Sequence, residues 1–340
     1  MADTVRIGGV EIKKTAILAP MASVADRAYR LICREFGAAA CVSEMVSAKG
    51  ICYSDRKTAE LCTVTPGERP MGIQLFGCEP EFMARAVEIV LEYSPDFIDI
   101  NMGCPVPKVA GNGSGSALMK DVGLAAAVAE AAVKAAGNVP VTAKIRSGWS
   151  GDSVNAAEVA KALEASGVAA VAVHGRTRDQ FYSGSADISV IRDVKNAVKI
   201  PVIGNGDVTG AGSCLKMYRE TGCDLVMIGR GSYGNPFVFA EIEAAVDGRE
   251  YVPPTVEERM QVMLRHIRMI VEMSAKTEPF AMHEARKHAA WYMNGGYGSA
   301  KFRARCYQLS SYAEAENLAD EFINLQSGRM HKKSAEISLD

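Results

Sequence analysis

Short apolar runs recur along the first 231 residues, and stretches whose apolar residues have helical spacing separate them. The runs are rich in Val, Ile and Ala, which predicts strands covered on both faces, as in a parallel sheet. The stretches between them have apolar residues three or four apart, which predicts helices. The predicted strands lie at residues 15–21, 40–45, 71–77, 97–103, 141–148, 169–177, 200–208 and 224–231. The clearest predicted helices lie at 26–37, 81–93, 153–167 and 188–198.

Eight strands that alternate with helices are what an α/β fold of the (β/α)8 TIM barrel type requires. The main alternative is a doubly wound sheet, which usually carries a G-x-G-x-x-G turn after its first strand. The first predicted strand runs instead into APMASV (19–24), which is no phosphate-binding turn, so the barrel is favoured. Ahead of it, VRIGGVEIKK (5–14) alternates apolar and polar residues around Gly-Gly and predicts a hairpin that closes the barrel floor.

The strand pattern ends near residue 250, where Pro-Pro is followed by helical patterns only. The pattern therefore predicts a barrel domain at residues 1–250 and a C-terminal all-helical domain at 251–328. Residues 329–340 are polar and predict a frayed tail. The C-terminal helical patterns lie at 253–276, 283–296 and 311–325.

The composition is that of an ordinary globular protein, with 48% hydrophobic and 23% charged residues. A net charge of −2 means that a nucleic-acid partner would have to meet a local basic surface. No segment has the length and apolarity of a signal peptide or a membrane span. Nine cysteines without a C-x-x-C pattern are most simply reduced thiols in the cytoplasm, and of the histidines only His283 and His288 have a metal-ligand spacing. We therefore expect no membrane association, no metal and no obligate protein partner.

Polar residues stand at the ends of the predicted strands, where (β/α)8 barrels place their reacting groups. Barrel packing alone does not require so many of them. In chain order they are Pro20, Met21, Glu44, Gln74, Asn101, Cys104, Lys144, Arg146, His174, Arg176, Asn205, Gly206, Asp207, Gly229 and Arg230.

The turns after the seventh and eighth strands, GNGD (204–207) and IGRG (228–231), occupy the usual phosphate-binding corner of these barrels. Glycine lets backbone N–H groups point at an anion, and Arg230 adds charge-assisted bonds. The alternative is that the glycines only make tight turns. The pair of turns favours a phosphate, which could belong to a cofactor or to a sugar phosphate.

Lys144 lies inside the apolar strand VTAKIRSG (141–148), where an unpaired charge is costly to bury. One interpretation is that its ammonium stabilises negative charge on a reduced flavin ring, with Gln74 binding the pyrimidine-like edge. The alternative is a lysine–carboxylate pair inside the barrel. His174 alone is more often a core histidine, but its place before Arg176 and Arg178 favours a cofactor or substrate contact.

Cys104 follows an apolar strand on a turn that contains Gly103 and Pro105. A thiol with an ordinary pKa of about 8.5 is mostly protonated at neutral pH and can give its proton to a developing carbanion. The alternative is a cysteine that only fills space, which is common among buried cysteines. The position on a loop at a strand end favours a catalytic acid.

The sequence resembles the tRNA-dihydrouridine synthase family, and its bacterial branch most closely. The stretches that carry the resemblance are APMASVADRAYRLICREFGA (19–38), VSEMVSA (42–48), IQLFG (73–77), DINMGCPVPKV (99–109), GSALM (115–119), VTAKIRSGW (141–149), HGRTR (174–178), IPVIGNGDV (200–208) and MIGRG (227–231), with EARKHAAWYMNG (284–295) as a looser match.

The resemblance implies a barrel that binds FMN, NADPH as electron donor, and reduction of the C5=C6 bond of a uridine in tRNA to 5,6-dihydrouridine. It implies that Cys104 gives a proton to C5 while the flavin gives hydride to C6. The residues expected to bind FMN are Pro20, Met21, Ala22, Gln74, Lys144, His174, Asn205, Gly206, Asp207, Gly229 and Arg230. The candidates for the flipped-out uridine are Asn101, Arg146 and Arg176.

The resemblance also implies that the C-terminal helices dock tRNA, mainly through its shape and phosphates. The basic residues Arg286, Lys287, Lys301, Arg303 and Arg305 form a candidate surface, although nearby glutamates leave an ordinary solvated face as the alternative. The loop AGNGSGSA (110–117) departs from the family, whose members often carry lysines or arginines there. This difference predicts a weaker phosphate contact or a different uridine.

Two other functions remain open at this point. One is an FMN-dependent reductase or dehydrogenase of a free small molecule such as a pyrimidine, which would need no docking domain. The other is a non-catalytic tRNA-binding protein, which would have no use for an acid at Cys104.

Overall fold

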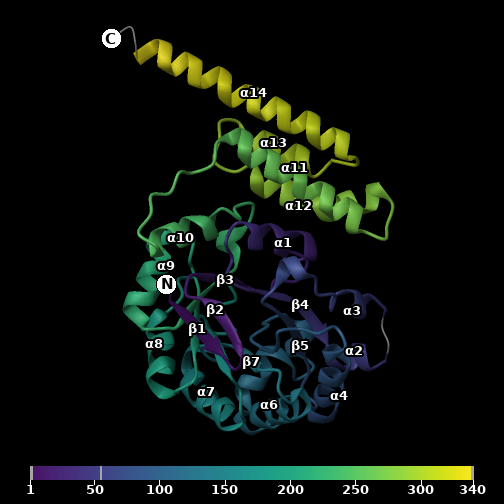
Figure 1. Cartoon of the computed structure of the whole chain (residues 1–340), viewed down its shortest axis with the longest axis vertical. Helices are drawn as coiled ribbons and strands as arrows, with labels where there is room; N and C mark the ends of the chain where they lie inside the picture. Colours follow the sequence, from purple (N-terminus) through teal and green to yellow (C-terminus); the bar gives the residue numbers. More distant parts are fainter. Residues whose placement is uncertain (1–2, 54–55, 338–340) are drawn as a thin grey trace. The chain divides into compact units, whose positions relative to one another are not determined.

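A computed structural model describes residues 3–53 and 56–337 of the chain. All strands of its central sheet are parallel, and they close into a barrel in the order β10-β3-β4-β5-β6-β7-β8-β9 (Figure 1). This confirms the predicted (β/α)8 fold. The barrel strands are β3 (Ala16–Leu18), β4 (Cys41–Ser47), β5 (Met71–Phe76), β6 (Phe97–Met102), β7 (Val141–Arg146), β8 (Ala170–His174), β9 (Val202–Asn205) and β10 (Leu225–Ile228).

The chain divides into two compact units. The barrel unit comprises residues up to 231 and 238–250, and the second unit comprises 232–237 with the residues from 251 onward. In the barrel unit, helices surround the strands (Figure 1). They are α1 (Arg27–Glu35), α2 (Ala48–Cys52), α3 (Arg56–Glu60), α4 (Pro80–Leu91), α5 (Pro107–Ala110), α6 (Val122–Ala136), α7 (Ala156–Ala165), α8 (Ile188–Ala197), α9 (Ala211–Thr221) and α10 (Val238–Val246).

A hairpin lies at the amino ends of the barrel strands. Its strands β1 (Thr4–Ile7) and β2 (Val10–Lys13) are antiparallel, and Gly8 in the turn has a φ of 56°. Ile7 and Ile12 are buried in one cluster with residues that begin barrel strands, Phe97 and Leu225 among them. The predicted hairpin therefore closes the barrel floor.

Several strands end earlier than the hydrophobic pattern predicts. β9 ends at Asn205 because Gly206 has a φ of 137° and Asp207 a φ of 50°, conformations that no strand contains. β3 ends at Leu18, two residues before Pro20, which has no N–H for a sheet hydrogen bond. The residues that follow these strands thus lie on turns at the barrel mouth.

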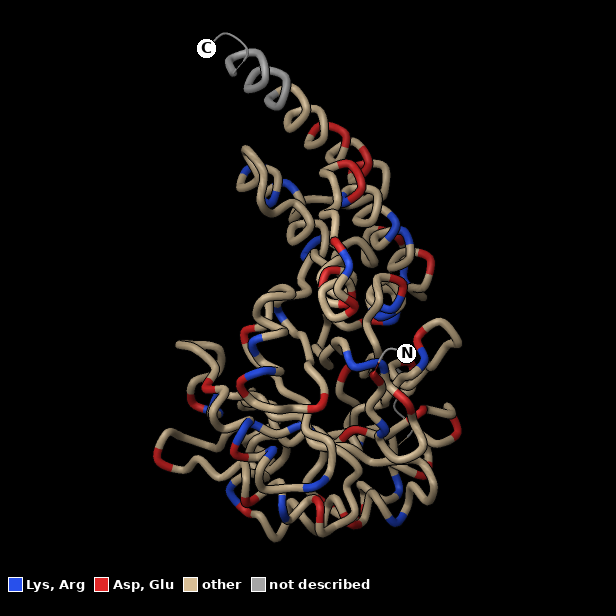
Figure 2. The backbone as a smooth tube through the Cα atoms, turned by 60° about the vertical axis from the view of Figure 1, so that its left-hand side comes forward, with Lys and Arg blue, Asp and Glu red and all other residues tan. Residues whose placement is uncertain are grey.

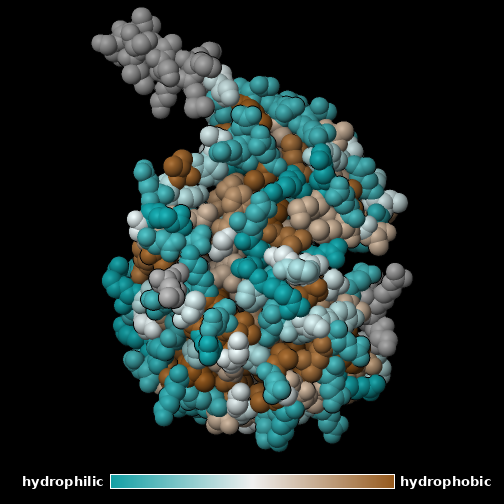
Figure 3. All heavy atoms as spheres, viewed as in Figure 1, coloured by the Kyte–Doolittle hydropathy of each residue, from teal (hydrophilic) through white to brown (hydrophobic). Residues whose placement is uncertain are grey.

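The outer helices pack through small or amphipathic faces. The buried residues of α6 are mostly alanines three or four apart, such as Ala125, Ala129 and Ala132, which let neighbouring backbones approach closely. In the space-filling view, hydrophilic side chains lie over the helices with smaller apolar areas between them (Figure 3). This is the pattern expected of helices that turn one face to a sheet.

A buried ion pair joins α1 to the turn before β5. Arg30 Nε donates to Glu68 Oε1 at 2.7 Å, and the two side chains are 4% and 0% exposed. Replacing Glu68 with glutamine should lower the free energy of unfolding by about 3 kcal/mol, because the buried guanidinium loses its counter-charge. Urea denaturation followed by circular dichroism measures this. The solvent-exposed pair Lys134–Glu130 gives the control, since Glu130→Gln should change stability by less than about 1 kcal/mol.

The second unit contains the helices α11 (Val256–Met273), α12 (Glu278–Tyr292), α13 (Ser299–Cys306) and α14 (Tyr312–Ile337). Thr255 caps α11, since its hydroxyl accepts from Glu258 N and Glu258 accepts from Thr255 N. The apolar faces of the helices form a core that includes Met260, Ile267 and Phe322.

The tail predicted for residues 329–340 differs from the structure over residues 329–337, and residues 338–340 lie outside the described residues. The helix α14 continues through this segment to Ile337. The reason is that residues 329–337 contain neither Gly nor Pro, and several of them are good helix formers, so polarity alone does not end the helix. In the described part of the chain, no helix has both the length and the apolarity needed to cross a lipid bilayer.

Candidate active site at the carboxyl ends of the barrel strands

A chain of hydrogen bonds crosses the barrel interior from β5 to β7. Gln74 Nε2 donates to Asp99 Oδ2 at 2.6 Å, and Thr142 Oγ1 donates to Asp99 Oδ1 at 2.6 Å. Asn101 Nδ2 donates to Gln74 Oε1 at 2.9 Å. All four side chains are buried. The network fixes the orientation of Gln74, a predicted flavin contact, and leaves its amide engaged on both sides.

Asp99 is a residue that the sequence reasoning missed. It stands two residues before Asn101, so both side chains point to the same face of β6, which is the barrel interior. Burial raises the pKa of Asp99, while the hydrogen bonds from Thr142 and Gln74 and the charge of Lys144 lower it in part. The spacing of two between Asp99 and Asn101 was the available signal.

Lys144 lies on β7, half-buried, and faces the same interior. Burial and then the charge of Arg146 lower its pKa, Asp99 and Cys104 oppose the shift, and the resulting pKa is about 8. Among the described residues, no ion pair joins Lys144 to a carboxylate. The alternative of a closed lysine–carboxylate pair therefore does not hold, and the ammonium remains available to a bound group.

The turn that carries Cys104 is held by Asn101. Its side-chain oxygen accepts from Gly103 N at 3.1 Å and from Cys104 N at 2.9 Å, which closes the turn directly after β6. Ser116 N then donates to the Cys104 carbonyl at 3.1 Å. Asn101 thus positions the thiol, whereas its predicted contact with uridine stays a prediction.

The Cys104 thiol is half-buried and protonated at neutral pH. Burial raises its pKa, while a backbone N–H of Val106 and the charges of Arg146 and Lys144 oppose the rise. The same cations lie where they stabilise the thiolate once the proton has left. This environment suits a group that donates a proton and regains it, rather than a nucleophile that must stay ionised.

Arg146 joins the Cys104 turn to the loop after β8. It is 3% exposed. Its Nε donates to the Gly103 carbonyl at 2.8 Å, and its Nη1 donates to the carbonyls of Thr177 and Phe181 at 2.8 and 3.0 Å. Arg146 therefore holds the Cys104 turn against the loop after β8, and its contact with uridine stays a prediction.

Arg176 and Asp207 form a bidentate ion pair at the predicted phosphate corner. Both nitrogen–oxygen distances are 2.8 Å, Arg176 is 2% exposed, and Ala186 N also donates to Asp207. Burial alone would raise the pKa of Asp207, but these bonds and the charge of Arg230 lower it overall. The carboxylate is therefore ionised and neutralised by Arg176, while the half-exposed Arg230 lies 3.5 Å away.

His174 points into the same corner as a neutral ring. Burial lowers its pKa to about 2, and the charges of Lys144, Arg146 and Arg176 act in the same direction. Neither ring nitrogen makes a hydrogen bond of acceptable geometry within the described part of the protein, although both are buried, and a nearby backbone group of Asn205 opposes the pKa shift only weakly. An unsatisfied buried imidazole is costly, which indicates that a bound group supplies the missing partner.

The turn after β9 brings backbone close to this corner. A Cβ on Gly206 would lie 2.5 Å from Ala186 Cβ and 3.5 Å from His174 Nδ1, so no side chain fits there. Asn205 Nδ2 donates to the Met227 carbonyl at 2.8 Å and ties β9 to β10. Backbone without a side chain therefore lies beside His174 at this turn.

The residues after β3 meet the eighth turn. A Cβ on Gly229 would lie 3.6 Å from Met21 Sδ, so the two turns are in contact. Pro20 and Met21 are half-buried and Ala22 is exposed. The structure therefore brings the first and last strand ends together, as the predicted flavin site requires.

The predicted basic surface of the second unit is partly used within that unit. Arg305 is bound to Glu321 at 2.8 Å, Arg303 to Asn294 Oδ1 at 2.9 Å, and Arg286 Nε to the Leu309 carbonyl at 2.7 Å. The charges of two of these helices are separated: α13 carries only basic charged residues, and residues 312–328 of α14 carry only acidic ones (Figure 2). Of the five candidates, Lys287 and Lys301 have neither an ion pair nor a side-chain hydrogen bond among the described residues.

These features define a (β/α)8 barrel whose mouth combines a protonated thiol, a lysine with a lowered pKa and a corner where Arg176 pairs with Asp207 next to a buried neutral histidine. The family model for dihydrouridine synthase matches residues 17–327, and the chain belongs to this family. It is 41% identical to a probable tRNA-dihydrouridine synthase of Rickettsia bellii, over 88% of this chain and 91% of that one. It is 39% identical to tRNA-dihydrouridine synthase B of Pseudomonas aeruginosa, over 90% and 92% of the two chains.

Solved structures support the fold alone. A variant of NCR from Zymomonas mobilis superimposes with a TM-score of 0.53 at 15% identity, covering 76% of this chain and 94% of that one.

All nine cysteines of this chain are free thiols, in line with the sequence-based expectation.

Proposed function

We propose that this chain reduces a uridine of tRNA to 5,6-dihydrouridine, with FMN as bound cofactor and NADPH as electron donor. The support is family membership together with the geometry of Cys104. That residue is a protonated thiol on a turn fixed by Asn101. It lies close enough to Lys144 for the ammonium to stabilise the thiolate that forms when the proton leaves. A non-catalytic tRNA-binding protein would not need this arrangement.

The residues at the barrel mouth fit FMN. Lys144, with its ammonium unpaired, would lie at the electron-rich edge of the ring, beside Gln74. His174, whose ring nitrogens lack partners, would bond the ribityl phosphate end together with the backbone of Gly206 and the guanidinium of Arg230. When bound, FMN would supply a hydride to C6 of the uracil, and NADPH would reduce the flavin again.

The chain's own part of the reaction is the second hydrogen. Cys104 Sγ–H donates a proton to C5 as negative charge develops there, and the thiolate regains a proton from water. Arg146 and Lys144 lower the cost of that transient thiolate. Asn101, Arg146 and Arg176 remain the candidates for contacts with the base, which must leave its stack to enter the barrel.

Recognition of tRNA beyond the target base is proposed to use the second unit. Lys287 and Lys301, which have no ion pair in the part of the chain that the structure describes, are the first candidates for phosphate contacts, since the three arginines are held internally. A location in the cytoplasm is proposed because tRNA and reduced thiols occur there together.

The test is to follow the visible flavin spectrum of the purified protein under anaerobic conditions. NADPH should bleach the spectrum, and unmodified tRNA should restore it with formation of one dihydrouridine per flavin oxidised. A free pyrimidine such as uracil or orotate should restore it far more slowly. Rapid reoxidation by the free pyrimidine and none by tRNA would instead indicate a small-molecule reductase, and a protein unable to bind FMN would overturn the proposal.

A further inference from the structure

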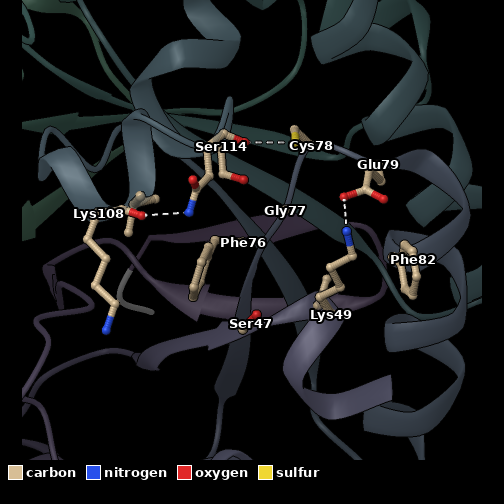
Figure 4. A pocket seen from close by; sticks show the side chains of 12 residues that line it. Ser47, Lys49, Phe76, Gly77, Cys78, Glu79, Phe82, Lys108 and Ser114 are labelled. Atoms are coloured by element: carbon tan, nitrogen blue, oxygen red, sulfur yellow. Dashed lines mark hydrogen bonds and ion pairs between the residues drawn. The ribbon is translucent and has the colours of Figure 1, made fainter. Parts of the chain in front are cut away.

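A second pocket opens beside the catalytic turn, with a volume of about 360 Å³ (Figure 4). This volume lies in the range of small-ligand sites. The pocket is formed by the carboxyl ends of β4 and β5 and by the segment that follows Cys104. None of its residues belongs to the set predicted for the flavin or the target uracil. Five of the lining residues matter below: Lys49, Phe76, Glu79, Lys108 and Val109.

The pocket is continuous with the Cys104 turn. Lys108 follows Cys104 by four residues, and the chain then returns, so that Ser116 N donates to the Cys104 carbonyl at 3.1 Å. A Cβ on Gly115 would lie 3.1 Å from Cys104 Cβ and 3.0 Å from Val109, which lines the pocket. A polymer bound with one unit at Cys104 therefore has this pocket as a neighbouring site.

The lining combines an aromatic ring with one unpaired cation. Phe76 is half-buried and stands between the side chains of Lys108 and Lys49 (Figure 4). Lys49 is neutralised by Glu79 at 2.7 Å. Lys108 is exposed, and its ammonium has no hydrogen bond or ion pair in the described part of the chain.

The small residues of segment 110–117 keep this pocket open. Residues 110–117 are AGNGSGSA, so the side chains that would otherwise project from the loop are absent or small. A Cβ on Gly113 would lie 3.4 Å from Cys78 Sγ, and Gly113 has a φ of 79° that disfavours other residues. The small residues thus leave space next to the Cys104 turn.

We propose that this pocket holds an unstacked nucleotide of tRNA that neighbours the target uridine, and this rests on the proposed function. Its base stacks on Phe76, and its phosphate meets Lys108. Aromatic rings bind bases of any sequence through their π-faces, and a lone lysine suits a phosphate. Flipping a neighbour as well as the target fixes the strand on both sides of the reacting base.

The test uses Phe76→Leu and Lys108→Gln, with Lys161→Gln on α7 as the matched control for an exposed lysine. Each pocket variant should raise the KM for tRNA by about 5- to 100-fold. Lys161→Gln should leave that KM unchanged, and all three should be reduced by NADPH at the wild-type rate. Since Lys108 is exposed, its substitution leaves the fold intact.

A second arm replaces the base on either side of the mapped target uridine by an abasic site. One of the two replacements should weaken wild-type turnover by a similar factor and have little added effect in Phe76→Leu, because both remove the same stacking contact. Independent, multiplicative effects would overturn the inference, as would a slower reduction by NADPH, which would assign the pocket to the donor. A wild-type protein that reduces no tRNA would instead refute the proposed function itself.

Discussion

Replacing Cys104 with alanine should slow the reoxidation of the reduced flavin by tRNA roughly 100- to 10,000-fold, the range that general acids contribute. Reduction of the flavin by NADPH should proceed at the wild-type rate, since this step needs no proton from the thiol. Stopped-flow measurement of the two half-reactions separates them. The expected effect is thus confined to one half of the cycle.

The physical reason lies in the environment of the thiol. Burial raises the pKa of Cys104, so the acid form predominates at neutral pH. The side-chain oxygen of Asn101 accepts hydrogen bonds from Gly103 N at 3.1 Å and from Cys104 N at 2.9 Å. Arg146 Nε donates to the adjacent Gly103 carbonyl at 2.8 Å. An alanine keeps the turn and removes only the proton donor.

Cys214→Ala is the control, because this cysteine lies on α9 and is buried away from the barrel mouth. It should leave both half-reactions unchanged. A serine at position 104 should recover little activity, since a hydroxyl is a much weaker acid than a thiol. Equal loss in both half-reactions of Cys104→Ala would show that the residue supports flavin binding rather than proton transfer.

The barrel could be predicted because its signal is repeated. Each strand is a short apolar run, each run is followed by a helical pattern, and the count of eight admits few folds. The strand ends were less accurate. Hydrophobicity continues through Ile200–Val208, whereas the conformations of Gly206 and Asp207 end β9 at Asn205.

The site residues could be placed on strand ends, but their partners could not be predicted. Nothing local in the sequence shows that Arg176 binds Asp207, which lies 31 residues later. Nor does it show that the side-chain amide of Asn101 hydrogen-bonds to Gln74 and to the Cys104 turn. Such pairings depend on how strands lie side by side. Asp99 was missed because it lies in the middle of an apolar run, whereas the candidates were sought only at the ends of the predicted strands.

Replacing Lys144 with methionine should lower the rate of tRNA reduction by about 100- to 1,000-fold, the typical loss for a group that stabilises developing charge. The same change should stabilise the protein without cofactor by about 1 to 2 kcal/mol, because a poorly solvated ammonium is replaced by an apolar chain of similar length. Thermal unfolding of apoprotein and single-turnover kinetics measure the two effects. A variant that loses both stability and activity would show that Lys144 is a structural residue.

The pH dependence gives an independent check on Lys144. Its pKa is about 8 in the folded protein and 10.5 in the unfolded chain, so the penalty for holding the ammonium is complete below pH 8. The penalty disappears as the pH rises from 8 to 10.5, and this group's contribution to apoprotein stability therefore increases over that window. Lys144→Met should remove that increase.

The activity should show the opposite trend, because the wild-type rate falls as Lys144 loses its proton above pH 8. Lys144→Arg stays charged and should therefore retain its activity to higher pH. An alkaline decline identical in wild type and Lys144→Arg would assign that decline to Cys104 instead.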